Sequence, residues 1–271
     1  MNIILNLNTE LMILSLQMLL LLAVVTWLIS VWISDVSIVD YIWSLLSLLA
    51  VVTYALSTDI SGPVSLGMLL MVAIWALRLS YFLIQRGYNQ PEDRRYQVIR
   101  ERNSPNFALK SLYLIFIFQA LVAWVMSLSF IPVFEAGSQG LMDWSPWHSL
   151  GVVLWLFGFV YETIADNQLK RFNSMVVKQG STLTSGLWRY CRHPNYFGEC
   201  CIWWAWFIYA IPTGSIWILV APLVMTYLLL KFSGVGNMEL GITNRRPDYQ
   251  SYIDSTNTFF PGRPHRKVLA D

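Results

Sequence analysis

The sequence predicts an all-α, polytopic membrane protein with seven transmembrane helices, its N-terminus outside and its C-terminus in the cytoplasm. Composition predicts the class, because 56% of the 271 residues are hydrophobic and only 13% are charged, against roughly a quarter in ordinary globular domains. Apolar runs fill most of the chain, and a span of the bilayer takes about 20 mainly apolar residues. The alternative is a soluble helical protein with a very large core. The 13 tryptophans and the positive mean hydropathy disfavour it.

Seven stretches reach or approach the length of a span. They cover residues 10–33, 37–57, 64–86, 108–131, 147–168, 197–213 and 215–233. The sixth and seventh are short and share the break Ile-Pro-Thr-Gly at 211–214, which predicts a tight helical hairpin. The first stretch is not predicted to be a cleavable signal peptide, because no Lys or Arg precedes it and its apolar part is long.

The distribution of Lys and Arg predicts the orientation. With the N-terminus outside, the outward segments are residues 1–9, 58–63, 132–146 and 212–214. None of the 18 Lys and Arg residues falls in these segments, and basic residues remain preferentially cytoplasmic. The prediction is therefore N-out and C-in. The three basic cytoplasmic segments are also expected to form an anion-binding rim.

Ionisable residues within the spans are functional candidates, because a charge there is costly. Asp40 begins the second stretch, where it either favours the helix dipole or lines a ligand cavity with the neighbouring Trp43. Arg78 lies deep in the third stretch, where pairing with an acid is favoured over snorkelling to the surface. Glu162 and Asp166 lie four residues apart on one helix face of the fifth stretch.

The strongest candidate is the start of the sixth stretch. Pro194 fits the first turn of a helix, so Asn195 and Glu199 fall on one face, with Trp203 one step further. This row of amide, carboxylate and indole is predicted to run from the cytoplasmic rim into the bilayer. Two residues just before the helix are predicted to meet phosphate together with its free N–H groups: Arg192 and His193.

A metal site is not predicted. The three cysteines form no paired CxxC spacing, and the three histidines are far apart in sequence, whereas zinc sites carry recognisable Cys and His spacings. No phosphate-binding glycine motif is present either.

The segment GLWRYCRHPNYFGE (186–199), with ADNQLKRF (165–172) before it and RRPDYQSYIDSTNTFFP (245–261) after it, resembles the steroid 5-alpha-reductase family, and above all its bacterial branch. A looser similarity covers residues 78–96, which end in DRRY. Sterol reductases and isoprenylcysteine carboxyl methyltransferases carry related forms of the RHPNY block. The segments around it favour the reductase.

The resemblance implies a single membrane reductase domain over residues 1–271. Residues 1–107 would form the substrate side, and residues 108–271 would bind NADPH at the cytoplasmic face. The enzyme would reduce the carbon–carbon double bond of a 3-oxo-Δ4-steroid or a similar lipid enone. Its expected partners are that lipophilic substrate and membrane lipids, with no nucleic acid and no obligate protein partner. The expected location is the bacterial inner membrane.

The resemblance also implies roles for individual residues. Asn195, Glu199 and Trp203 would flank the nicotinamide, and Tyr249 would close over the cofactor. The remaining cofactor contacts would come from the following residues, of which the last three lie in a segment that departs from the family pattern: Arg94, Arg95, Asp166, Lys170, Arg171, Arg192, His193, Asn237, Glu239 and Arg246.

The enone oxygen needs a hydrogen-bond donor as negative charge develops. In the family this role falls to an acid on the second helix and a tyrosine on the third. Asp40 and Tyr81 are the chemical equivalents here, together with Glu199 as the third catalytic candidate. Trp43 and Trp75 are expected to line the binding site of the flat substrate, with Asp40 beside them.

Two other functions compete with this prediction. An S-adenosylmethionine-dependent methyltransferase of isoprenylcysteine or phospholipid type shares the RHPNY block, but the many arginines in residues 86–102 favour a dinucleotide with three negative groups. A transporter would spread polar residues through its spans. Here they concentrate at the predicted cytoplasmic ends.

Overall fold

The computed structural model of the chain is helical, with 79% of residues in helices and no strand among the residues it describes, which are 7–58, 60, 62–175, 181–232 and 249–264. Five helical segments are long and apolar enough to cross a membrane. They are α1 (Thr9–Ile33), α2 (Ile38–Ser57), α3 (Gly62–Gly87), the segment Phe107–Ser127 and α8 (Pro146–Asn173). The chain is thus a membrane protein with transmembrane helices, and seven spans with N-out orientation stay a prediction.

The two short apolar stretches are also helical. The sixth forms α9 (Pro194–Ala210), and the seventh forms the shorter apolar helix Ile216–Lys231, which includes α10 (Val220–Tyr227). A 3₁₀ turn, Ile211–Thr213, separates them and ends at Gly214 with φ +68°, a conformation that favours glycine. The predicted helical break at 211–214 is confirmed.

The chain divides into two compact units. Unit 1 comprises Met1–His148 and Ala210–Ala221, and unit 2 comprises Ser149–Tyr209 and Pro222–Asp271. In unit 1, α2 packs on α1 and α3. The segment Phe107–Ser127 packs on α1 and α2, and it is built from α5 (Phe107–Ser111), the π-helical turn Leu112–Ile117 and α6 (Phe118–Ser127). The fourth apolar segment therefore belongs with the first three.

Buried hydroxyl groups hold the helices of unit 1 together. The Tyr54 hydroxyl lies between Ser15 Oγ at 3.1 Å and Ser127 Oγ at 2.9 Å, so that one phenol joins α1, α2 and α6. Ser44 Oγ donates to the Ala76 carbonyl at 2.8 Å, which joins α2 to α3. Small and polar residues suit such contacts, because hydrophobic residues gain little from leaving lipid.

Two short helices of unit 1 lie outside the spans. Part of the segment predicted as an outer loop, residues 132–146, is helical in α7 (Ile131–Ser138), where a proline occupies the first turn. The basic loop contains α4 (Arg94–Arg102), whose first turn is capped by the Asp93 carboxylate. Proline at a helix start and aspartate at an N-cap are both favourable.

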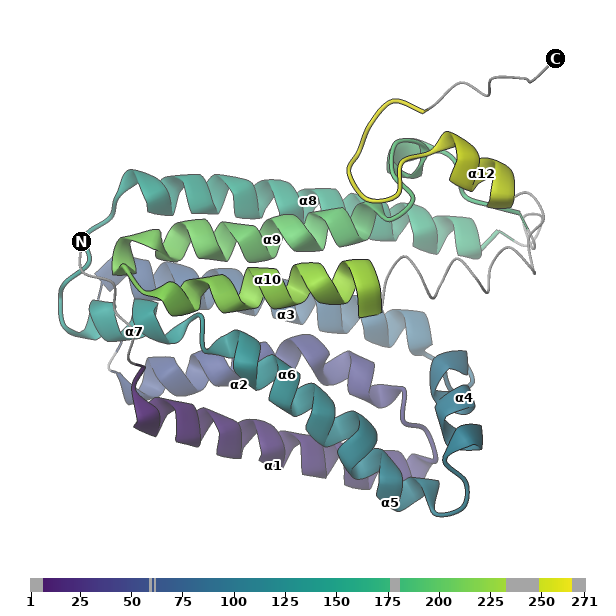
Figure 1. Cartoon of the computed structure of the whole chain (residues 1–271), viewed down its shortest axis with the longest axis horizontal. Coiled ribbons are helices and arrows are strands. Elements are labelled where there is room, and N and C mark those ends of the chain that lie inside the picture. Colours follow the sequence, from purple (N-terminus) through teal and green to yellow (C-terminus); the bar gives the residue numbers. More distant parts are fainter. Residues whose placement is uncertain (1–6, 59, 61, 176–180, 233–248, 265–271) are drawn as a thin grey trace. The chain divides into compact units, whose positions relative to one another are not determined.

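Unit 2 is built on a close approach of α8 to α9, which lie side by side in Figure 1. A Cβ added at Gly158 would lie 2.8 Å from the Gly198 carbonyl, and one added at Gly151 would lie 2.9 Å from the Tyr209 amide. The Thr226 hydroxyl joins α10 to α9, since it accepts from Trp204 Nε1 at 3.2 Å. Small residues thus allow the backbones to touch, as in many membrane helix pairs.

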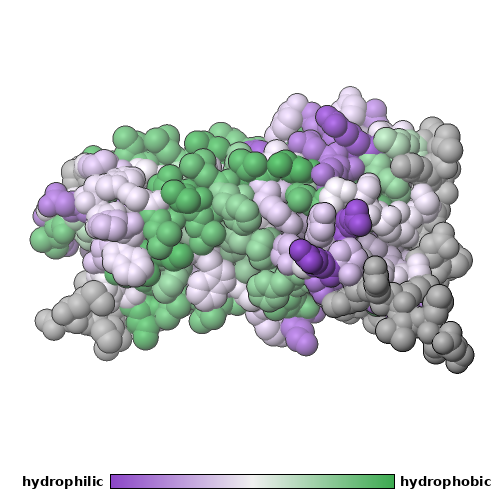
Figure 2. Space-filling view, turned by 90° about the horizontal axis from the view of Figure 1, so that it is seen from above, coloured by the Kyte–Doolittle hydropathy of each residue, from purple (hydrophilic) through white to green (hydrophobic). Residues whose placement is uncertain are grey.

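The remaining helix, α12 (Tyr249–Ser255), belongs to unit 2. Figure 2 shows apolar residues gathered over the middle of the helices and hydrophilic residues towards their ends. Large apolar side chains on α1, α3 and α8 are exposed, which fits helices that face lipid.

Candidate functional site

Three acidic residues are buried where α8 and α9 meet in unit 2. Glu162 and Asp166 lie one turn apart on α8, and Glu199 lies in the second turn of α9. A Cβ on Gly198 would lie 2.7 Å from Glu162 Cβ and 2.8 Å from its backbone nitrogen. The glycine next to Glu199 therefore brings the two acid-bearing segments together. We call Glu162, Asp166 and Glu199 the α8–α9 acids.

The row predicted on α9 is formed. α9 begins at Pro194, as expected, and Trp203 Nε1 donates to Glu199 Oε1 at 2.9 Å inside the unit. Asn195 lies half-buried in the first turn. The indole donates to one oxygen of the Glu199 side chain and so fixes the orientation of that carboxyl group.

The turn before α9 is attached to the α8 helix that carries the acids. Leu187 N donates to Gln168 Oε1 at 3.0 Å, and Trp188 Nε1 donates to the Ala165 carbonyl at 3.1 Å. Gly186 has φ +64°, and a Cβ there would lie 2.5 Å from the Gln168 side chain. These contacts explain the residues on both sides of Leu187, because only a glycine fits beside Gln168 and because the tryptophan indole reaches the α8 backbone. They also explain why Gln168 lies two residues after Asp166.

Arg192 holds the C-terminal segment rather than presenting its guanidinium to solvent. The side chain is 6% exposed and donates to the Ile253 and Thr256 carbonyls at 3.0 and 2.6 Å, and to Thr258 Oγ1 at 2.8 Å. Its backbone N–H donates to the Asn257 carbonyl at 2.9 Å. We assign no phosphate contact to Arg192, because these bonds already use three of the five N–H donors of its buried guanidinium.

Neighbouring residues strengthen the same attachment. The Tyr252 hydroxyl donates to the Trp188 carbonyl, and the Cys191 thiol donates to the Phe259 carbonyl at 2.9 Å. Burial raises the pKa of this thiol to about 11, so Cys191 is held as a neutral thiol. Tyr249 is buried at the start of α12, with its ring packed edge-on against Tyr252 at 5.7 Å.

The other predicted cofactor residues of unit 2 lie as follows. His193 is buried and stacks on the Tyr196 ring, with 5.5 Å between ring centroids. Lys170 and Arg171 are exposed in the last turn of α8, where cations favour the helix dipole. Asn237, Glu239 and Arg246 lie outside the described residues.

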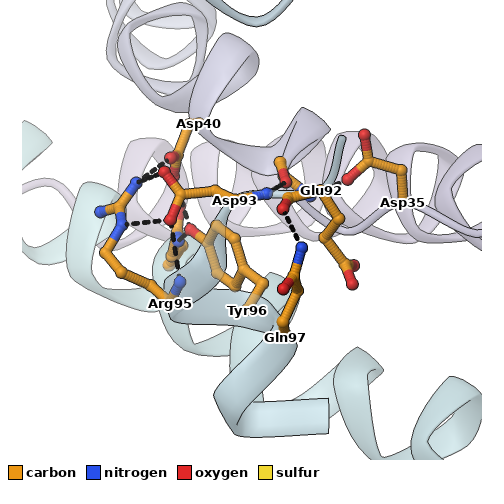
Figure 3. Close-up of polar contacts among 9 residues, drawn as sticks. Asp35, Asp40, Glu92, Asp93, Arg95, Tyr96 and Gln97 are labelled. Atoms are coloured by element: carbon orange, nitrogen blue, oxygen red, sulfur yellow. Dashed lines mark hydrogen bonds and ion pairs between the residues drawn. The ribbon is translucent and has the colours of Figure 1, made fainter. Parts of the chain in front are cut away.

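A second polar group lies in unit 1, where α4 packs on the start of α2 (Figure 3). Asp40 accepts from Arg95 Nη2 at 2.7 Å and from the Tyr96 hydroxyl at 2.5 Å. Arg95 also donates to the Asp93 carboxylate through Nε at 3.0 Å. The Tyr96 hydroxyl in turn accepts from Gln119 Nε2 at 3.3 Å.

The connection between α1 and α2 completes this group. Glu92 accepts from Arg100 Nη2 at 2.7 Å and from the Val36 N–H at 3.0 Å, and the Asp93 N–H donates to Ser37 Oγ at 2.7 Å. We call the ionisable members the α4 cluster. They are Asp40, Glu92, Asp93, Arg95, Tyr96 and Arg100.

The charges of the α4 cluster stabilise one another. Burial acts to raise the pKa of Glu92, but hydrogen bonds from Arg100 and Val36 outweigh it and lower that pKa. Burial and the Asp40 carboxylate both raise the pKa of Tyr96, which keeps the phenol neutral. α4 is therefore docked by charge-assisted bonds, the stronger class of hydrogen bond.

This geometry corrects the role expected of Asp40. Both of its oxygens accept hydrogen bonds, one of them from a guanidinium, whereas a group that polarises a ketone must donate one. Tyr81 is 62% exposed on α3, and Trp75 is fully buried in the core of unit 1. Trp43 is half-buried. We assign none of these residues to an enone.

Sequence reasoning missed the partners within the α4 cluster. Arg94 and Arg95 were expected to bind phosphate; Arg94 is exposed, whereas Arg95 is paired with acids. An available signal was the acid at the N-cap of a short basic helix, which predicts a capped turn. Nothing in the spacing indicated that Tyr96 would reach Asp40, 56 residues away in sequence.

One family model matches most of the chain. The profile described as "Protein of unknown function (DUF1295)" matches residues 26–256, a range that includes the α8–α9 acids and the α4 cluster. An uncharacterized protein of Schizosaccharomyces pombe is 28% identical over 286 aligned positions, which cover 94% of this chain and 80% of the relative. No solved structure matches the chain significantly.

Proposed function

This chain belongs to the DUF1295 family, and from that premise we propose that it is an NADPH-dependent oxidoreductase of the membrane. Its substrate would be a lipid enone such as a 3-oxo-Δ4-steroid, and the double bond next to the ketone would be reduced. The observation that carries the proposal is the Glu199–Trp203 bond beside the buried acids of α8, within the segment that resembles the steroid 5-alpha-reductases.

The residues of unit 2 fit the chemistry of a reduced dinucleotide. Its ribose hydroxyls and carboxamide N–H groups need acceptors, which Asp166 and Glu199 supply. Its phosphates need cations, and Lys170 and Arg171 are exposed on the same helix as Asp166. Asn195 carries both a donor and an acceptor in the first turn of α9. Arg192 is left out, because three of its donors hold the C-terminal segment.

NADPH, when bound, supplies a hydride that adds to the β-carbon of the enone, while a proton adds to the α-carbon and NADP⁺ leaves. The protein binds, orients and excludes water. Trp203 Nε1 donates to one oxygen of Glu199 and so fixes the orientation in which this side chain would meet a carboxamide. The close contact at Gly198 keeps this carboxylate away from water, so that each hydrogen bond it makes is stronger than in solution.

Dinucleotide binding is tested first with the intact protein in detergent. We expect NADPH to raise the melting temperature more than NADH does, and S-adenosylmethionine to leave it unchanged. Protection by S-adenosylmethionine alone would contradict the proposal and favour the methyltransferase. Protection by none of the three would reject both.

Hydride transfer is tested with NADPH deuterated at the transferable position and a 3-oxo-Δ4-steroid. We expect deuterium at the β-carbon of the saturated ketone. Glu199→Gln keeps an oxygen acceptor for Trp203 but removes the charge, and we expect turnover to fall about 100-fold, the value of one lost bond to a charged group. Asp254→Asn, which neutralises an exposed carboxylate of α12, is the control and should retain wild-type turnover. Normal turnover in Glu199→Gln would remove this residue from the site.

A further inference from the structure

The segment that follows α12 is attached rigidly to the start of α9. Beyond the three bonds of Arg192, the Gly262 N–H donates to the Tyr190 carbonyl at 3.0 Å and the Arg192 N–H donates to the Asn257 carbonyl at 2.9 Å. Residues 256–262 therefore have a defined place on unit 2, and their exposed side chains point in defined directions.

Phe260 is the most exposed aromatic side chain of this segment. It is 72% exposed, although its neighbour Phe259 is buried. Its ring packs edge-on against Phe197 of α9, with 6.1 Å between centroids. Moving a large apolar side chain out of water is favourable, so a partner that covers Phe260 would be stabilised by it.

The surface next to Phe260 continues along α8. Phe197 also contacts Phe157 at 6.5 Å and Tyr161 at 5.5 Å. Val153, one turn from Phe157 on this predicted span, is 63% exposed. Phe260 thus continues the apolar surface of a predicted membrane-spanning helix through Phe197.

Basic and amphipathic side chains border Phe260. Tyr190 and Arg189 are exposed, with the Arg189 guanidinium 6.0 Å from the Tyr190 ring centroid. The bond from the Gly262 N–H to the Tyr190 carbonyl places the backbone of the next residue, the exposed Arg263, near Tyr190. Aromatic rings beside arginines suit the boundary between acyl chains and headgroups.

We propose that Phe260, Tyr190, Arg189 and Arg263 form a membrane anchor, which we call the interface patch. Phe260 enters the acyl boundary, and the two arginines bind the phosphate groups of anionic phospholipids. Two observations indicate that lipid, and not another protein, covers the interface patch. The patch is continuous with the exposed face of α8, and its charge is opposite to that of an anionic bilayer surface. The inference does not depend on the reductase proposal.

Photo-crosslinking of the full chain tests where Phe260 lies. The photoreactive analogue p-benzoylphenylalanine replaces Phe260, and the protein is irradiated in nanodiscs of phosphatidylcholine and phosphatidylglycerol. The same analogue at Val153 is the lipid-facing control, and at the exposed Asp254 of α12 it is the aqueous control. We expect phospholipid adducts at position 260 at the level of position 153. A yield equal to that of position 254, or adducts to a second protein chain, would overturn the proposal.

The charge of the patch is tested in the same nanodiscs. Because each arginine near an anionic surface adds favourable attraction, we expect adducts at position 260 to be enriched in phosphatidylglycerol about threefold over its mole fraction. The double variant Arg189→Gln/Arg263→Gln should reduce the enrichment to about one, while adducts still form. The analogue replaces one aromatic side chain by another, and size-exclusion elution checks that each variant is folded. Equal enrichment in the wild type and the double variant would refute the role of the arginines.

Discussion

Replacing Arg192 by Met is expected to release the C-terminal segment of unit 2 without unfolding the helices. The guanidinium makes three hydrogen bonds of 2.6–3.0 Å at 6% exposure. A bond to a charged group contributes about 1.5–3 kcal/mol. The other contacts of the segment remain in the variant, so we expect the docking of residues 249–262 to weaken by about 3 kcal/mol, the value of one to two such bonds.

Hydrogen exchange measured by mass spectrometry reports the free energy of docking of residues 249–262 directly. A loss of about 3 kcal/mol corresponds to exchange about 100-fold faster in peptides from residues 249–262. Peptides from α1 and α2 in unit 1 should exchange at wild-type rates. Arg192→Lys keeps the charge but not the planar array of donors, so it should recover only part of the protection.

The matched control is Arg189→Met, three residues earlier in the same motif. Arg189 is exposed, and its guanidinium lies over the ring of the neighbouring Tyr190, so the free energy of docking should change by less than about 0.5 kcal/mol. If Arg192→Met exchanges within about threefold of the wild type, a change below about 0.7 kcal/mol, the reasoning about buried guanidinium bonds is refuted.

Three further predictions concern helix contacts. Gly198→Ala should lower the melting temperature in detergent and remove the protection by NADPH. The added Cβ would lie 2.7–2.9 Å from Glu162 atoms, most of them backbone, and such overpacking costs about 1–3 kcal/mol. Tyr96→Phe should speed hydrogen exchange in α4 by about tenfold or more, since it removes a bond to a carboxylate; unchanged exchange would show that this bond does not hold α4. The pKa of Glu92 is lower in the folded protein than its ordinary value of 4.5. Its ion pair with Arg100 therefore stabilises α4 fully above pH 4.5, and this stability is lost as the pH falls through the lower pKa of the folded protein. Hydrogen exchange in α4, corrected for intrinsic rates, should therefore accelerate as the pH falls below the folded pKa of Glu92. In the Glu92→Gln variant, the corrected exchange rate should depend less on pH.

The sequence by itself determined the class and the main helical segments of this protein. Long apolar runs leave the backbone no partner in lipid except itself, so helices follow from composition and length. The break at 211–214, the start of α9 at Pro194 and the pairing of Glu199 with Trp203 were also predictable, because each depends on spacing within a few residues.

Only the tertiary structure decided which distant side chains meet. Local spacing presents Asp40 as a candidate acid, but α4 brings Arg95 and Tyr96 to it. Spacing likewise presents Arg192 as a phosphate ligand, but residues 253–258 supply acceptors for its guanidinium. The physical reason is that local spacing fixes the face of a helix on which a side chain lies. The charge state of that side chain, and the number of its hydrogen-bond donors that remain for a ligand, depend on partners that folding brings from elsewhere in the chain.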